Sequence, residues 1–377
     1  MRLLSICVGI LRYLFHHAYF LHEPIGRRID LDQIRTYLRV IIYSVKITMK
    51  TIRISKLRIF IQSVFALLCL SAGYQFFHFY LWAAGKSDVY VPRPPSVEGF
   101  LPISALLGLK RFVLTGRYDD VHPAGLTIFL AALTIALLLR KGFCGWICPV
   151  GFASNLIEKA GKKIQLIQHL PAWLDLPLRS IKYFLLAFFC YVILWKMDLS
   201  AVEAFIYSPY NKIVDGKMLL LFLEPSKLTL QVLVALILIS LVLRNFWCRY
   251  LCPYGALLGL LGFISPAQVK RKPELCTHCK NCEKVCPASI RISRKRTVRD
   301  AECIGCMECV EVCPQKDCLT LSLPKAKKAS EFFLPVAVVL VFVAFWAIAV
   351  YGGHWQTSIS PEAARKIYPL SSHFGHP

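Results

Sequence analysis

Five long apolar stretches constrain this chain of 377 residues more than any other feature. With their flanking residues, each can cross about 30 Å of hydrocarbon at a helical rise of 1.5 Å per residue. Their central parts hold almost no ionisable side chain, as expected where a charge costs about 2.5 to 3.5 kcal/mol. Buried helices of a large soluble core are the weaker explanation, because five such stretches occur in one basic chain. We expect spans near residues 58–83, 124–141, 181–198, 227–246 and 332–351.

The composition agrees with a membrane protein. Hydrophobic residues make up 56% of the chain and charged residues only 18%, whereas soluble chains are roughly a quarter charged. The net charge of +23 would indicate nucleic acid as the partner of a soluble protein. With a cytoplasmic N-terminus, however, 34 of the 45 Lys and Arg residues fall on the inner side. We therefore predict a multi-pass protein of the bacterial inner membrane with its C-terminus outside, which binds lipid and no nucleic acid.

The N-terminal segment 1–57 is predicted to be basic and cytoplasmic. Its two apolar runs, 3–15 and 37–48, are too short to span and fit interfacial amphipathic helices. Alternatively, Met49 is the biological start and the preceding part is an extension. A secretory signal is disfavoured because no small-residue cleavage site follows the first run.

The end of the second predicted span is repeated at the end of the fourth. LLLRKGFCGWICPVG at 137–151 matches LVLRNFWCRYLCPYG at 241–255, which indicates two related halves. Repeats of this kind commonly build a site at their interface. Four thiols at one depth on the cytoplasmic side could hold a further iron–sulfur centre or a metal, or act as a redox dithiol. Alternatively, they pack as small hydrophobic residues. The four are Cys144, Cys148, Cys248 and Cys252.

Two complete C-x-x-C-x-x-C-x-x-x-C-P runs start at Cys276 and Cys303. In this ferredoxin pattern the fourth cysteine of one run ligates the other cluster. Tetrahedral zinc is disfavoured because it typically uses two separated C-x-x-C pairs. Cys318 lies outside the pattern and is expected to be a spectator. The predicted ligands are Cys276, Cys279, Cys282 and Cys313 for cluster one, and Cys303, Cys306, Cys309 and Cys286 for cluster two.

These features predict an α-helical multi-span membrane protein with a small inserted α+β ferredoxin domain of the bacterial type, which binds two [4Fe-4S] clusters. After the N-terminal segment we expect a four-span membrane core, the ferredoxin domain, a fifth transmembrane helix and an extracytoplasmic tail. Their ranges are 58–266, 267–324, 332–351 and 352–377.

The paired C-x-x-x-C-P motifs, the twin ferredoxin runs and the multi-span core resemble the membrane-bound polyferredoxins of the NapH and NosR type. The resemblance covers roughly residues 50–350. It implies an electron-transfer subunit, rather than a stand-alone enzyme, that acts between the quinone pool or a membrane redox subunit and a respiratory enzyme. It also implies a redox role for the C-x-x-x-C-P cysteines. The alternatives are an assembly or maturation factor for a metalloenzyme, or a regulatory redox factor.

The loop 91–125 is rich in polar residues and is the predicted entry point for quinol. Arg93, Glu98 and His122 could bind a head group and accept its protons. Glu203 is a further candidate because Val202-Glu203 echoes the residues at 97 and 98. Alternatively, Arg93 simply pairs with Glu98, and His122 precedes a helix that opens with proline. The neighbouring acids Asp119 and Asp120 are also candidates.

Overall fold

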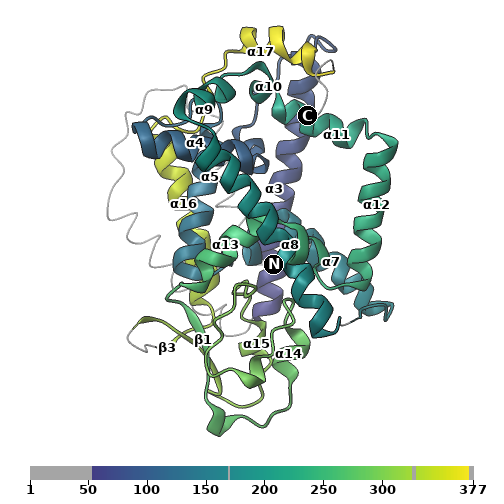
Figure 1. Cartoon of the computed structure of the whole chain (residues 1–377), viewed down its shortest axis with the longest axis vertical. Helices are drawn as coiled ribbons and strands as arrows, with labels where there is room; N and C mark the ends of the chain where they lie inside the picture. The colour runs from purple at the N-terminus through teal and green to yellow at the C-terminus, as the bar shows by residue number, and fades with distance from the viewer. Residues whose placement is uncertain (1–52, 169, 325–327, 373–377) are drawn as a thin grey trace, which may run out of the picture. The chain divides into compact units, whose positions relative to one another are not determined.

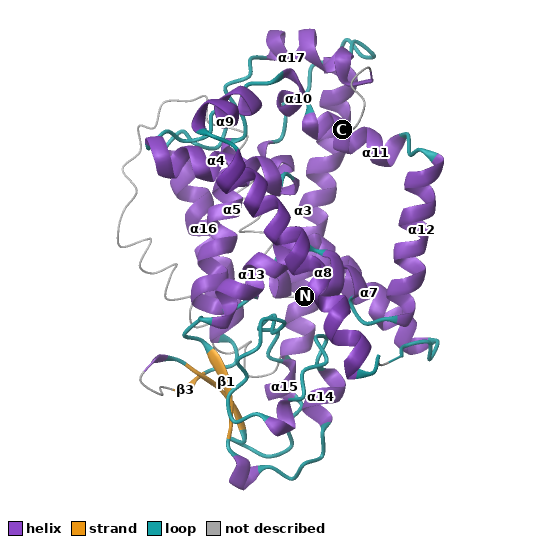
Figure 2. Ribbon diagram, in the orientation of Figure 1, coloured by secondary structure: helices purple, strands orange, loops and turns teal. Residues whose placement is uncertain are grey.

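The computed structural model describes residues 53–168, 170–324 and 328–372 (Figure 1). Most of the predicted segment 1–57, with both apolar runs and its internal methionine, lies outside these described residues. From Arg53 onward, the described residues form one unit. Helices make up most of this unit, and one small three-stranded sheet lies in its cysteine-rich part (Figure 2).

Three described helices are long and apolar enough to cross a membrane, which confirms the predicted multi-span helical architecture. A fourth crossing results if α11 (Val214–Leu223) and α12 (Lys227–Val242), joined at a bend of 77°, count as one span. The three long helices are α3 (Ile54–Ala83), the stretch Trp173–Lys196 formed by α8 (Ala172–Cys190) and η2 (Tyr191–Lys196), and α16 (Phe333–Tyr351).

The number of five spans stays a prediction, since length and composition support three spans in the described residues, or four with the bent pair. The stretch 124–141 is the helix α5 (Pro123–Leu139), whose 17 residues lie at the short end of the range for a crossing. Most of α5 is buried, and it packs against α16 and α13 (Pro253–Phe263). Its apolar side chains therefore contact mainly other helices of the protein. The stretch 227–246 is also shorter than predicted, because α12 alone has 16 residues.

The sequence repeat is also a repeat of local structure. In the first half, α5 is followed by the short helix α6 (Gly142–Trp146) and by α7 (Pro149–Lys163). In the second half, α12 is followed by the turn η3 (Trp247–Leu251) and by α13. Both α7 and α13 begin with proline directly after the second cysteine of the motif, at the helix position where a missing N–H leaves no bond unmade.

Short helices gather at one end of α3, and the cysteine-rich part lies at the other end (Figure 1). Near the start of α3, the Ser55 N–H donates to Glu311 of the cysteine-rich part. Near its end, the Tyr80 hydroxyl is 3.1 Å from the Ser371 hydroxyl. We call these two ends the module end and the α17 end. The helices at the α17 end are η1 (Pro95–Phe100), α4 (Pro102–Thr115), α9 (Leu199–Ile206), α10 (Pro209–Lys212), α17 (Pro361–Ile367) and η7 (Tyr368–Ser372).

The cysteine-rich module, residues 267–324, combines an antiparallel sheet of order β1-β2-β3 with short helices. Val269 lies opposite Leu321 in the sheet, and both are buried in the same hydrophobic core as Trp146 and Leu334 of the helical part. The module is therefore packed against the membrane helices. Its elements are β1 (Gln268–Arg271), η4 (Pro273–Leu275), α14 (Asn281–Val285), η5 (Ile292–Arg294), α15 (Glu308–Glu311) and β2 (Leu319–Ser322); β3 (Lys328–Ala329) follows it.

Candidate redox site

The two cysteine runs form loops with the same backbone conformation. In the first run, His278 and Lys280 flank the second cysteine with φ angles of 54° and 59°. In the second run, Gly305 and Met307 occupy the equivalent positions, and both have a φ of 62°. Turns with such residues aim successive backbone N–H groups into one concavity, which suits an anion. The loops therefore fit the predicted cluster, whose four thiolate ligands carry negative charge.

The fourth cysteine of each run lies beside cysteines of the other run. Cys313, from the second run, interacts electrostatically with Cys282 of the first. Cys286, from the first run, interacts with Cys306 and Cys309 of the second. This proximity is what the crossed ligand sets require. The assignment of ligands to clusters itself stays a prediction.

Cys318 lies closer to the first ligand set than its sequence position indicates. Its side chain is buried and interacts with both Cys276 and Cys313, and its Sγ is 3.7 Å from the Lys272 carbonyl oxygen. The cysteine spacing did not predict this contact. Cys318 directly precedes β2, and the pairing of β2 with β1 places it near the first run. Among the described residues, no group of three or more His, Cys, Asp or Glu side chains is arranged to hold a single metal ion.

The four cysteines of the repeated motifs meet at the interface of the two halves. Cys144 interacts electrostatically with the other three, which are Cys148, Cys248 and Cys252. All four are free thiols and partly exposed. The Lys141 Nζ and the Cys252 Sγ both lie beside Gly255, at 3.4 Å and 3.5 Å from the position that a Cβ there would take. We call these four cysteines the thiol site.

Lys141, Glu302 and Lys182 form a buried charge network beside the thiol site. The Lys182 Nζ is 2.5 Å from Glu302 Oε1, and the Lys141 Nζ is 3.9 Å from Glu302 Oε2. Lys182 is fully buried although it belongs to the span Trp173–Lys196. Sequence reasoning missed this network, but a lysine within an apolar span is a recognisable signal of a paired or functional residue. Glu302 directly precedes Cys303, so the network connects the thiol site with the second run.

The peptide between the two cysteines of the first motif lies against the second run. A Cβ at Gly145 would be 2.3 Å from the Ile304 carbonyl oxygen, so only glycine permits this contact. The neighbouring Trp146 Nε1 donates to the Gly305 carbonyl at 3.0 Å. Arg58 extends the contact, because it donates to the Gly145 carbonyl at 3.0 Å and to the Glu308 carboxylate at 2.7 Å. The predicted ligand loop of cluster two is thus fixed directly on the thiol site.

A second group of buried charges occupies the α17 end, and we call it the outer cluster. Arg93 lies between two buried carboxylates, 2.6 Å from Glu98 and 2.7 Å from Asp215. The Tyr368 hydroxyl donates to Asp215 at 2.9 Å. The structure therefore brings Arg93 and Glu98 together, as their alternative structural interpretation expects. Asp215 and Tyr368 were missed because they are far from Arg93 in the sequence.

His122 is the fully buried histidine of the outer cluster. Its Nδ1 is 3.5 Å from Glu98 Oε1, and its Nε2 is 2.7 Å from the Asn211 carbonyl oxygen. Burial lowers the pKa of His122, but the hydrogen bond and charge of Glu98 outweigh burial and raise the pKa above its ordinary value. The nearby Arg93 opposes this shift, and Asp215 supports it. Burial also raises the pKa of Asp119, against hydrogen bonds from the backbone of His122 and of the residue before it.

Glu203 does not join the outer cluster, which corrects its predicted grouping with Glu98. α9 places Glu203 beside Arg111, with its Oε1 3.8 Å from the Arg111 Nε and its side chain 37% exposed. Arg111 also pairs with Asp120 at 2.7 Å. The sequence echo between the two glutamates is therefore not matched by an equivalent environment, because one lies on η1 and the other on α9.

We expect the stability of the protein to decrease as the pH rises through the raised pKa of His122. The protonated ring is stabilised in the folded state, and that contribution is complete only below its ordinary pKa of about 6.5. Thermal unfolding should therefore be measured from about pH 5.5 to about pH 9. His122→Asn should flatten the decrease, whereas the exposed control His354→Asn should not. An unchanged pH profile in His122→Asn would contradict this role.

Comparison with known proteins decides the family. The "Putative electron transport protein YccM" of Escherichia coli strain K12 is 41% identical over 311 residues, and the match covers 79% of this chain and 86% of the relative. The chain belongs to the NapH/NosR-type 4Fe-4S proteins. A family described as "4Fe-4S binding domain" matches residues 121–167 and again 228–272, which are the two halves of the repeat. A "4Fe-4S dicluster domain" matches residues 268–314.

Further members of this family match smaller parts of the chain. The "Ferredoxin-type protein NapH" of Haemophilus influenzae is 27% identical over 52% of this chain and 68% of its own length. "Protein NirI" of Paracoccus denitrificans is 30% identical over 56% of this chain, but the match covers only 31% of NirI. No solved structure matches the chain. With its apolar helices, the protein is a membrane-associated 4Fe-4S electron-transport protein.

Proposed function

We propose that the protein relays electrons between membrane quinol, or a membrane redox subunit, and a respiratory enzyme through two [4Fe-4S] clusters. The observation that carries the proposal is the contact of the second cysteine run with the thiol site, at Gly145 and Ile304. Each bound cluster would supply one-electron transfer. The eight run cysteines would hold the clusters in the crossed sets, and the ferredoxin domain 267–324 would carry them.

The thiol site is proposed as the next redox station, either as a further iron–sulfur centre or as a redox dithiol. Burial raises the pKa of the Cys144 thiol, and the Lys141 ammonium beside the site opposes this shift. Glu302 and Lys182 hold Lys141 in a buried network whose other side borders Cys303. A change of charge at either centre therefore acts on the same three side chains.

The proposed quinol site consists of Arg93, Glu98 and His122, without Glu203. His122 Nδ1 is the polar atom available for a proton, since Nε2 faces the Asn211 carbonyl oxygen and Glu98 stabilises the charged form of the ring. Arg93 forms an ion pair with each of the two neighbouring carboxylates by lying between them. Their mutual pairing also supports a purely structural role.

The protein is proposed to lie in the bacterial inner membrane with its module in the cytoplasm and residues 352–372 outside. α3, the stretch Trp173–Lys196 and α16 all start at the module end and finish at the α17 end. Most Lys and Arg residues belong to segments that this orientation places inside. The positive-inside rule therefore supports the same side for the N-terminus and the module.

Quinol should reduce the clusters of the purified protein in lipid nanodiscs under anaerobic conditions, as monitored by EPR. Reduction by dithionite but by no quinol would contradict quinol entry. In the double variant Cys148→Ser/Cys252→Ser, quinol-driven reduction should fall to background while dithionite still reduces the clusters. Cys190→Ser, a partly exposed thiol of a span, is the control. Unchanged quinol-driven reduction in the double variant would make the four thiols packing residues.

A maturation or regulatory factor for a metalloenzyme is the second candidate function. The partly exposed free thiols of the thiol site favour it, because such a site could reduce a metal or disulfide of another protein. A deletion strain distinguishes the two functions. Loss of respiratory flux with a fully metallated partner enzyme supports electron relay, whereas an unmetallated partner enzyme supports maturation.

A further inference from the structure

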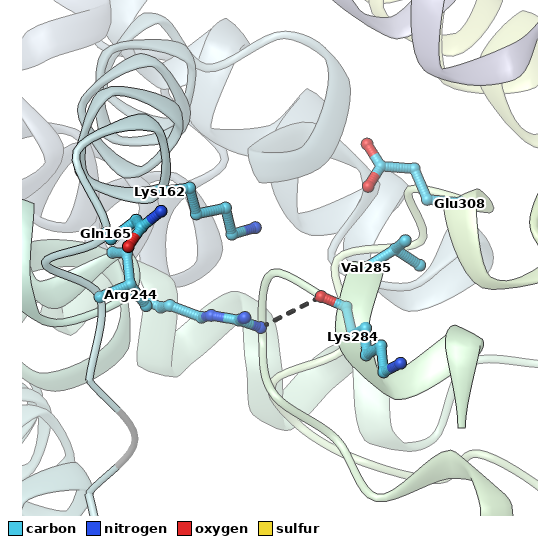
Figure 3. A pocket seen from close by; sticks show the side chains of 7 residues that line it. Lys162, Gln165, Arg244, Lys284, Val285 and Glu308 are labelled. Carbon is cyan, nitrogen blue, oxygen red and sulfur yellow. Dashed lines mark hydrogen bonds between the residues drawn. The ribbon is translucent and has the colours of Figure 1, made fainter. Parts of the chain in front are cut away.

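A basic pocket of about 510 Å³ lies where the cysteine-rich module meets the membrane helices (Figure 3). Figure 3 shows the Arg244 side chain extending across it toward the Lys284 carbonyl oxygen. Lys162 and Arg244 come from the two repeated halves, and Lys284 comes from the module. The lining residues are Lys162, Gln165, Ile167, Arg244, Lys284, Val285 and Glu308.

The carboxylates at this pocket are already paired, so the pocket has surplus positive charge. Glu308 is held by Arg58 at 2.7 Å. Glu158, which lies behind the pocket, is held by Lys162 and by the Asn245 amide at 2.6 Å. The surplus positive charge indicates that the pocket is suited to an anion.

Arg244 and Lys284 are the two cations with donors to spare. The Arg244 Nε is buried without a hydrogen bond and is 3.9 Å from Glu158. Its NH1 makes only long contacts of 3.4 Å, to the carbonyl oxygens of Lys284 and Cys286. The Lys284 side chain is exposed and has no carboxylate within ion-pair distance among the described residues. A phosphate oxygen is the acceptor that such a guanidinium and ammonium bind strongly.

The surface next to the pocket is apolar. α12 ends two residues before Arg244, and most of its side chains are exposed. Val234, Ile237 and Leu238 are 47%, 50% and 57% exposed. A ligand with a phosphate head and hydrocarbon chains would therefore match both surfaces, and a free phosphate would match only the pocket.

We propose that this pocket binds the phosphate head group of an acidic phospholipid, with its acyl chains along α12. Basic pockets at the ends of transmembrane helices bind such head groups. Because Arg244 belongs to the membrane part and Lys284 to α14, the bound lipid would join the two parts next to Cys282 and Cys286. The proposal does not depend on the direction or the partner of electron transfer.

Native mass spectrometry of the protein, taken from nanodiscs of equal phosphatidylglycerol and phosphatidylcholine, tests the proposal. We expect retention of phosphatidylglycerol over phosphatidylcholine. At about 1 kcal/mol per cation, the preference should fall about fivefold in Lys284→Gln and about 25-fold in Arg244→Gln/Lys284→Gln. Lys316 is an exposed lysine of the module outside the pocket, so the control variant Lys316→Gln should keep the preference for phosphatidylglycerol. Equal retention of both lipids by the wild type would overturn the proposal.

Two further measurements distinguish lipid binding from the binding of soluble phosphate, and loss of binding from loss of folding. An excess of inorganic phosphate should not displace the lipid, and displacement would show that the site serves soluble phosphate instead. Lys284→Gln should retain the iron content of the wild type, because the Lys284 side chain is exposed and holds no ion pair in the described residues. A retained lipid preference in this folded variant would contradict the role of Lys284.

Discussion

Cys286→Ser and Cys313→Ser should each remove about half of the bound iron, from about eight atoms per chain to about four. Each variant removes one ligand from a different cluster, since each of these cysteines is predicted to reach across to the other run. Iron and acid-labile sulfide should be measured on anaerobically purified protein. Cys318→Ser is the control, because this buried thiol touches Cys276 and Cys313 but lies outside both runs.

Two double variants separate crossed from uncrossed ligand sets. Cys282→Ser/Cys313→Ser affects only cluster one if the sets cross, so about four iron atoms should remain. Cys282→Ser/Cys286→Ser then damages both clusters, and nearly all iron should be lost. The opposite pattern would show that each run holds its own cluster. The proximity of Cys313 to Cys282, and of Cys286 to Cys309, favours the crossed result.

Glu302→Gln should destabilise the protein by about 3 to 5 kcal/mol, because removal of one partner leaves buried charge uncompensated. Lys182 is fully buried, and Glu302 is the carboxylate within ion-pair distance of both Lys182 and Lys141 among the described residues. The free energy of unfolding in mixed micelles is the measurement. Asp317→Asn, which breaks an exposed pair with Lys328, is the control and should change stability little.

A compensating substitution tests the same network from the other side. Lys182→Met in the Glu302→Gln background removes one of the two uncompensated cations and should recover part of the stability. Equal stability of Glu302→Gln and the wild type would show that the network is dispensable. A further loss on adding Lys182→Met would show that Lys182 acts through packing rather than through its charge.

The sequence predicted the multi-span helical architecture, whereas the number of spans stays a prediction. Hydropathy identified α3, α16 and the stretch Trp173–Lys196, because each contains a long window of mostly apolar residues. Hydropathy could not distinguish α5, which is mostly buried in protein, from a helix that faces lipid, since both are equally apolar. α5 ends two residues before the end of the predicted span, because the chain leaves the helix at Arg140, where φ is 62° and the buried guanidinium donates to the Asp300 carbonyl.

Spacing in the sequence identified the cysteines as candidate ligands, but it gave no information about the charged side chains around them. The cysteine runs and the repeated motifs are local patterns, so their residues could be named directly. Lys182 and Glu302 are 120 residues apart, and Asp215 and Tyr368 are 153 residues apart. Only the packing of the helices brings these partners together. The grouping of Glu203 with Glu98 was wrong for the same reason. It rested on a similarity of the local sequence, which carries no information about neighbours from distant parts of the chain.

The most direct test of the central claim is EPR of the anaerobically purified protein, combined with iron analysis. The account predicts about eight iron atoms per chain and the signals of two reduced [4Fe-4S] clusters after addition of dithionite. Iron near zero after anaerobic reconstitution, with no cluster signal, would contradict it.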